Sequence, residues 1–176
     1  MTNMFTRQIS LSAPIFLSIF VVQEALISQF RLPGGGFSIL LIFALTWSVL
    51  SQAEVAAVIG FASGLLMDLS QSSSGPFGQW TLIMLLAGYA ISYIGYGDDN
   101  VHANAIGIVF FVVVATFFVE VAFLISGALL GVSVGSIAQV VITLIGMSMW
   151  SLLVAPIMLP LFTKLHALVF DSRSVI

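Results

Sequence analysis

Six long apolar runs, separated by short polar segments, fill nearly all of the 176-residue chain. A bilayer core of about 30 Å needs about 20 apolar residues per helix, and unpaired backbone groups are too costly in hydrocarbon for an irregular span. The sequence shows no shorter runs of alternating polarity, which are typical of barrel strands. The pattern therefore predicts an all-α integral membrane protein, a bundle of six transmembrane helices. The predicted spans cover residues 10–30, 36–50, 53–69, 79–96, 103–130 and 135–163.

The predicted spans differ in length. Only Ser51 and Gln52 separate the second span from the third, so these short runs form either a tight helical hairpin or one bent re-entrant unit. The fifth and sixth spans are long, and we expect them to tilt, kink or protrude. Pro156 and Pro160 predict a kink in the sixth span, because proline cannot donate the helical hydrogen bond.

The composition indicates a single integral membrane domain over residues 1–176. Charged residues make up 6% of the chain and the mean hydropathy is +1.21, against roughly a quarter charged in a soluble domain. The chain has no cysteine, which excludes disulfides, iron–sulfur clusters and thiolate metal sites. The first run is interpreted as an anchor rather than a signal peptide, because it carries Gln23 and Glu24 and lacks a small-x-small cleavage site.

The basic residues predict an orientation. They are Arg7, Arg31, Lys164 and Arg173. An even number of spans puts both termini on one side, which groups the other three against Arg31 alone. The positive-inside rule then places both termini in the cytoplasm. The sequence has no basic cluster that would indicate binding to nucleic acid or to anionic lipid headgroups.

Acidic residues inside the predicted spans are candidates for function, because intramembrane charges are costly. With cytoplasmic termini, Glu24, Asp68 and Glu120 all fall in the outer half of the bilayer, where Arg31 is the single cation. They are then protonated, paired with positive charge on a partner, or in contact with water. Glu24 and Asp68 are equally compatible with snorkelling to the interface. Glu120 has apolar neighbours on both sides, so we predict a specific role for it.

Other polar residues have structural explanations. Glu54 starts the third span, where a carboxylate interacts favourably with the helix dipole. Asp98 and Asp99 fall in a short loop and are expected to be solvated. His102 and His166 have no ligand partner at metal-site spacing, so no metal site is predicted.

A stripe of small residues marks the third span. Gly60, Gly64 and Asp68 are spaced four apart and therefore lie on one helix face. Glycines at this spacing let another helix approach closely, so the carboxylate at the end of the stripe is expected at a helix contact or a cavity wall. Two further pairs are predicted to pack in the same way: Gly88 with Ser92, and Gly127 with Gly131.

An uncharged loop follows the stripe, and Pro76 and Gly78 are expected to set its shape. The order Gly60-Phe61 to Asp68-Leu69, then Pro76-Phe77-Gly78, then an aliphatic span, resembles the bacterial rod shape-determining protein MreD family. Further segments that resemble this family are Pro33-Gly34-Gly35 before the second span, Glu120 in the fifth, and Trp150 with Pro156 in the last. One departure is the C-terminal tail, which lacks the several basic residues that many members carry.

The resemblance implies a fold similar to the six-helix substrate-binding subunits of energy-coupling-factor transporters. It also implies a non-enzymatic scaffold in the bacterial cell (inner) membrane, part of the cell elongation machinery that makes peptidoglycan and maintains cell shape. The implied partners are an MreC-like single-pass membrane protein, with RodA and a class B penicillin-binding protein in a larger complex; no cofactor is implied. The residues assigned to helix packing or the partner interface are Gly60, Gly64, Asp68, Pro76, Gly78, Glu120, Trp150 and Pro156.

A partner's single-pass helix is expected to dock in a groove lined by small side chains. Thr143, Gly146 and Trp150 fall on one face of the last span and provide such a surface. The outer carboxylates, chiefly Asp68 and Glu120, are expected either to orient the loop or to meet a donor on the partner.

Two rival functions compete with the scaffold. The substrate-binding subunit of an energy-coupling-factor vitamin transporter would share the fold, and an acidic outer cavity would suit a cationic vitamin. Such subunits usually carry an Ala-x-x-x-Ala face on the first helix, whereas Ala13 is followed four positions on by Leu17. Gly95-Tyr96-Gly97-Asp98 matches an intramembrane aspartyl protease motif, but the second carboxylate, Asp68, is predicted on the opposite side of the membrane. We therefore expect no enzymatic activity.

Overall fold

The computed structural model describes residues 2–30, 32–70, 75–95, 104–133 and 135–170. Within these ranges the chain forms helices and no strand, which confirms the all-α prediction. The α-helices are α1 (Thr2–Ala25), α2 (Ile39–Leu50), α3 (Ala53–Leu69), α4 (Gln79–Gly95), α6 (Ala105–Leu129) and α7 (Ile137–Phe170). Two 3₁₀-helices, η1 (Ile27–Gln29) and η2 (Pro33–Gly35), lie between α1 and α2.

Among the described residues, four helical segments are long and apolar enough to cross a membrane. They are Ser10–Gln29, Pro33–Leu50, Ala105–Leu129 and Ile137–Phe170. α3 and α4 have 17 residues each, which gives a helix length of about 26 Å. Every α-helix except α2 exposes large apolar side chains, for example Leu17, Phe61, Tyr93, Phe118 and Leu153. A surface of this kind is compatible with a lipid environment.

Several helix ends differ from the predicted spans. α3 matches its predicted range, but α1 begins at Thr2 and ends at Ala25, and α7 continues to Phe170. Polar turns extend α1 at its start and α7 at its end, because hydropathy marks only the apolar part of a helix. At its other end α1 stops within the apolar run, and η1 follows it. α2 begins at Ile39 rather than at residue 36, because Ser38 caps it by accepting a hydrogen bond from the Leu41 amide at 3.2 Å.

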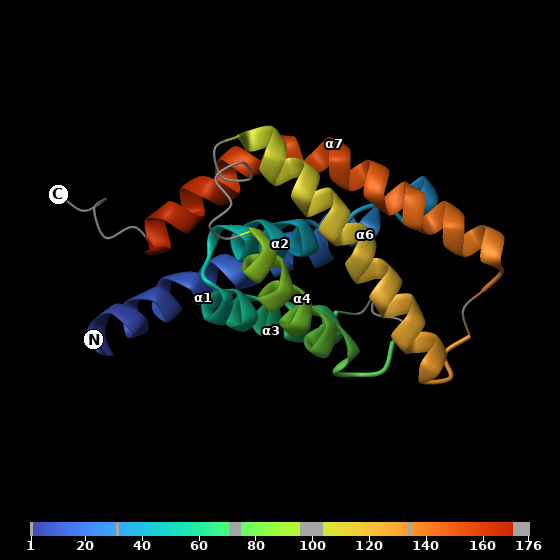
Figure 1. The fold of residues 1–176 in the computed structure, drawn as a ribbon, viewed down its shortest axis with the longest axis horizontal. Helices are drawn as coiled ribbons and strands as arrows, with labels where there is room; N and C mark the ends of the chain where they lie inside the picture. The colour runs from blue at the N-terminus through green and yellow to red at the C-terminus, as the bar shows by residue number, and fades with distance from the viewer. Residues whose placement is uncertain (1, 31, 71–74, 96–103, 134, 171–176) are drawn as a thin grey trace.

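α2 lies at the centre of the bundle (Figure 1). Its residues from Leu40 to Val49 are all buried. The rings of Phe43 and Phe162 meet at 5.2 Å between centroids, and the Trp47 indole N–H donates to the Phe162 carbonyl at 3.0 Å. α2 and α3 are separate helices packed against each other, so the second and third predicted spans form the tight hairpin and not a single bent unit.

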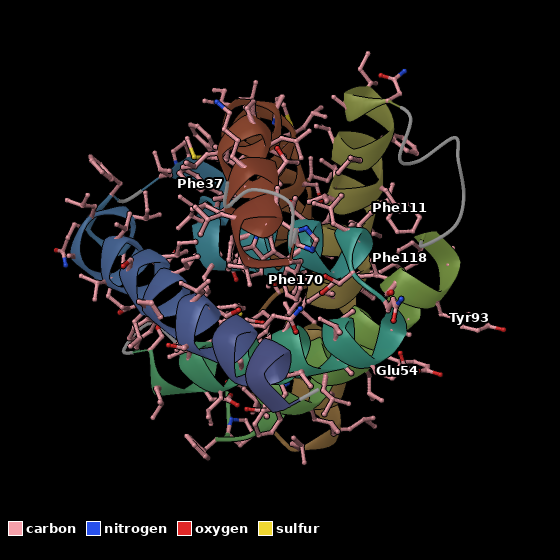
Figure 2. All side chains as sticks on the ribbon, turned by 90° about the vertical axis from the view of Figure 1, so that its left-hand side faces the viewer. Phe37, Glu54, Tyr93, Phe111, Phe118 and Phe170 are labelled. Carbon is pink, nitrogen blue, oxygen red and sulfur yellow. The ribbon has the colours of Figure 1, made fainter. Side chains whose placement is uncertain are left out.

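The two ends of the bundle are built from different segments. The start of α1 and the end of α7 lie at the same end of the molecule (left in Figure 1). We call the opposite end the cavity end; it holds the end of α1, the start of α2, the α3–α4 connection, the end of α6 and the start of α7. Figure 2 views the molecule from the other end, where Glu54 and Tyr93 point away from the bundle.

α7 remains helical through both of its internal prolines. Figure 1 shows α7 as an arch rather than a straight rod, and proline is the usual cause of a bend inside a helix. Pro156 and Pro160 are both exposed on the outer surface of α7.

The glycine stripe of α3 packs against the backbone of α4. A Cβ atom placed at Gly60 would collide with the Met84 carbonyl, and one at Gly64 would lie 2.5 Å from the Trp80 carbonyl oxygen. On the opposing helix, a Cβ at Gly88 would lie 2.5 Å from the Ala56 carbonyl oxygen. The two helices therefore touch backbone to backbone, and the predicted packing face is covered by α4 of the same chain.

The prediction for Gly131 was wrong. Gly131 does not pack with Gly127 against another helix but ends α6, where it has a φ of 83°. Its amide donates to the Ala128 carbonyl at 3.1 Å, and the Val132 amide donates to the Gly127 carbonyl at 2.9 Å. This pair of hydrogen bonds is the Schellman arrangement, which needs a residue in the left-handed region, and the periodicity of small residues does not distinguish it from helix packing.

We expect Gly60→Ala to destabilise the protein by about 1–3 kcal/mol or more, because backbone atoms of α4 cannot move as a flexible side chain can. The matched control is Gly127→Ala in α6, where a Cβ meets the Gln79 Nε2 at an ordinary 3.4 Å. Thermal unfolding in detergent checks both variants. Equal unfolding temperatures for the two variants would contradict the close α3–α4 contact.

Candidate functional site

Asp68 joins the end of α3 to the start of α4. Its Oδ1 accepts a hydrogen bond from the Trp80 amide at 3.1 Å, and its Oδ2 accepts from the Thr81 amide at 2.9 Å and the Thr81 hydroxyl at 2.5 Å. These amides are in the first turn of α4, so Asp68 does the work of an N-cap from the preceding helix. Asp68 therefore joins the last turn of α3 to the first turn of α4.

The turn that enters α4 depends on Pro76 and Gly78. The Gln79 amide donates to the Pro76 carbonyl at 3.1 Å, and Gly78 has a φ of 94°, a conformation that favours glycine. Phe77, between them, is exposed to 71%. The turn therefore presents an aromatic ring outward, and Pro76 and Gly78 shape the entry into α4.

Gln79 makes a polar contact between α4 and α6 that was not predicted from the sequence. Its Nε2 donates to the Phe123 carbonyl and to the Ser126 hydroxyl, both at 2.7 Å, so it connects α4 to α6. Its Oε1 is buried and has no hydrogen-bond partner in the described part of the chain. The sequence feature that could have indicated this contact is the glutamine at the first position of an apolar run.

The small-residue face of α7 is covered by the chain's own η2 turn. Gly146 lies against the backbone of Gly34, and Thr143 lies against Gly35. The Trp150 indole N–H donates to the Pro33 carbonyl at 3.0 Å. Glycines with positive φ in the α1–α2 connection therefore occupy this part of the α7 face, and docking of a partner helix stays a prediction.

A cavity of about 550 Å³ opens at the cavity end of the bundle. Its wall is built from the end of α1, the η1–α2 connection, α3, α4, α6 and the first half of α7. Two predicted carboxylates line it, Glu24 from α1 and Glu120 from α6, whereas Asp68 binds the start of α4 instead. The three acids thus gather at one end of the bundle, as the sequence predicted, but only two share the cavity.

The two cavity carboxylates have different surroundings. Glu24 is partly buried, and its Oε1 accepts a hydrogen bond from the Ser70 hydroxyl at 2.5 Å. Glu120 is 8% exposed, and no hydrogen bond among the described residues involves it. Glu120 therefore lies in the cavity wall, and its specific role stays a prediction.

Aromatic rings form part of the same wall. Trp80 and Phe123 stack with 4.2 Å between ring centroids and an interplanar angle of 17°. The Gln23 side-chain oxygen accepts from the Ile39 amide at 2.8 Å and so fixes α1 against the start of α2. Sequence periodicity could not identify this wall, because its members come from helices that are distant along the chain.

The opposite end of the bundle is filled by side chains. The His166 ring lies 2.9 Å from the Ser51 hydroxyl and stacks on Phe170 with 4.5 Å between centroids. The described residues contain no group of acidic or histidine side chains that could hold a metal ion. Asp98, Asp99 and His102 lie outside the described residues, and of the protease-like motif only Gly95, the last residue of α4, is described.

We expect Asp68→Ala to lower the stability of the protein by about 1–2 kcal/mol, because the first amides of α4 lose their acceptor. Asp68→Asn keeps one acceptor oxygen and should fall between Ala and the native residue. Thermal unfolding measures the order. Glu54→Ala, at an exposed carboxylate in the first turn of α3, should cost no more than about 0.5 kcal/mol. An unchanged unfolding temperature for Asp68→Ala would show that the cap contributes nothing.

Comparison with known proteins gives no relative for this chain. No protein-family model matches it. No curated protein and no solved structure matches it either. The function of the chain is therefore inferred from its own residues and from the motif of residues 60–69 and 76–78.

Proposed function

We propose that the protein is a non-enzymatic membrane scaffold of the MreD type, which binds an MreC-like single-pass membrane protein. Through that partner it would act with RodA and a class B penicillin-binding protein in peptidoglycan synthesis during cell elongation. In this proposal each of the six α-helices in the described part of the chain crosses the bacterial cell membrane, α3 and α4 as short spans, with both termini in the cytoplasm. The similarity to the substrate-binding subunits of energy-coupling-factor transporters is part of the same proposal.

The proposal is supported mainly by the contacts that the motif residues make in the structure. Gly60 and Gly64 bring α3 against the α4 backbone, and Asp68 caps α4 across the Pro76–Gly78 turn. These contacts hold the α3–α4 hairpin in shape, which is a structural role and not a catalytic one. The exposed faces of the long helices remain apolar, and another membrane helix can pack on such faces in lipid.

The acidic cavity is the observation that favours the transporter subunit as a second candidate. Glu24 and Glu120 line a space of about 550 Å³, which falls in the size range of small-molecule sites. In a transporter the protein would associate with paired ATPases and a coupling membrane subunit. The two functions therefore differ in the proteins that accompany the chain.

The scaffold function is tested by affinity purification of the tagged, detergent-solubilised protein from its native membranes, read by mass spectrometry. We expect enrichment of an MreC-like single-pass protein and of cell-wall synthases relative to an unrelated multi-pass membrane protein carrying the same tag. Recovery of paired ATPases with a coupling subunit would contradict the scaffold and favour the transporter. Recovery of neither group would also count against the scaffold.

The proposed orientation is tested with single cysteines, for which the cysteine-free chain is a ready background. Phe77→Cys lies in the α3–α4 connection and Gln52→Cys lies in the α2–α3 connection, so the two exposed positions are at opposite ends of α3. We expect a membrane-impermeant maleimide to label Phe77→Cys in intact cells, and to label Gln52→Cys only after permeabilisation. The reverse pattern would place the termini outside, and labelling of both positions in intact cells would contradict a spanning α3.

A further inference from the structure

The cavity at the cavity end has the lining of a small-molecule site. Its walls are largely apolar and include Phe20, Phe37 and the stacked rings of Trp80 and Phe123. A few polar groups interrupt these walls, as is usual where a site fixes the orientation of its ligand. The cavity opens to the outside rather than being sealed within the bundle.

Glu120 is the residue that indicates a ligand-binding site. It is more than nine-tenths buried, its side chain lines the cavity, and it takes part in no hydrogen bond among the described residues. No lysine or arginine of the described chain lines this space. The Glu120 oxygens are not among the fully buried atoms that lack a partner, so they face the open cavity, where a positively charged donor can reach them.

The other members of the wall restrict the charge of that donor. Glu24 brings a second carboxylate into the same space from α1. An anion would be repelled by both carboxylates, and an apolar molecule would leave Glu120 without a partner. The stacked Trp80–Phe123 pair adds aromatic surface, which attracts cations as well as apolar groups.

We propose that this cavity binds a small organic cation, an ammonium group attached to an apolar body, and that Glu120 pairs with the ammonium. Glu24 adds negative charge, and the aromatic wall holds the apolar body. The proposal does not depend on the scaffold function, since partner binding and ligand binding are read by separate experiments. The ammonium group can come from a free amine or from a lipid headgroup such as ethanolamine.

The test uses the full-length protein in detergent and three probes of similar size: 2-phenylethylamine as the cation, 2-phenylethanol as the neutral analogue and phenylacetate as the anion. Isothermal titration calorimetry measures the dissociation constant of each probe, and thermal unfolding gives a second readout. We expect the amine to bind and to raise the unfolding temperature. The alcohol and the acid should bind at least about tenfold more weakly, because they lose a charge-assisted hydrogen bond.

Glu120→Gln keeps the shape of the side chain and removes its charge. We expect this variant to fold and to bind 2-phenylethylamine about tenfold or more weakly. The matched control is Glu54→Gln, the same chemical change at an exposed carboxylate of α3 that points away from the bundle (Figure 2); it should bind like the native protein. Unfolding curves of both variants separate a lost site from a lost fold.

Three results would overturn the proposal. The first is equal binding of all three probes, and the second is amine binding that survives Glu120→Gln. The third concerns Arg31, which lies outside the described residues although its neighbours Phe30 and Leu32 line the cavity. If the native protein ignores the amine and Arg31→Gln binds it, the occupant of the site is the chain's own guanidinium.

A second arm identifies the source of the ammonium group. The native protein and Glu120→Gln are purified in parallel and their retained lipids are measured by mass spectrometry. Phosphatidylethanolamine enriched over phosphatidylglycerol with the native protein alone would identify a headgroup. Amine binding without such enrichment would identify a free amine.

Discussion

The backbone contact between α3 and α4 determines much of the rest of the structure. Helices in lipid gain little from burying apolar surface, so close van der Waals contact and hydrogen bonds must hold them together. Gly60, Gly64 and Gly88 provide the contact, and Asp68 provides hydrogen bonds across its end. The position of α4 then places Trp80 in the cavity wall and Gln79 against α6.

The bundle is solid at one end and hollow at the other. Trp47, Phe162 and His166 fill the end where α7 finishes, and they pack around the central α2. At the cavity end the helices separate around Glu24 and Glu120. The filled end holds packed aromatic side chains, and the open end is lined by two carboxylates together with apolar side chains. A scaffold and a ligand site are compatible in such a molecule because they use different surfaces.

Local sequence rules predicted the features that depend on a single helix. The bounds of α3, the stripe from Gly60 to Asp68 and the gathering of acids at one end all follow from residue spacing and from counting spans. The same rules failed where a contact joins distant segments. Nothing in the period of α7 indicates that the Pro33 turn covers Trp150, and nothing in α6 alone distinguishes Gly131 as a helix end from Gly131 as a packing residue. The cavity was predicted only as an excess of outer carboxylates, because its aromatic wall is assembled from α1, α4, α6 and the segment between α1 and α2.

The hydrogen bond between Trp150 and the Pro33 carbonyl joins residues 117 positions apart, and the bond between Trp47 and Phe162 joins residues 115 apart. A ribosome adding about 5–20 residues per second needs roughly 6–23 s to make that much chain. During that interval the central helix and its glycine turn are already synthesised, but the helix that covers them is not. Biogenesis therefore leaves α2 without its α7 cover during that interval, and an insertion factor or a neighbouring membrane protein would have that time to shield α2 before α7 is made.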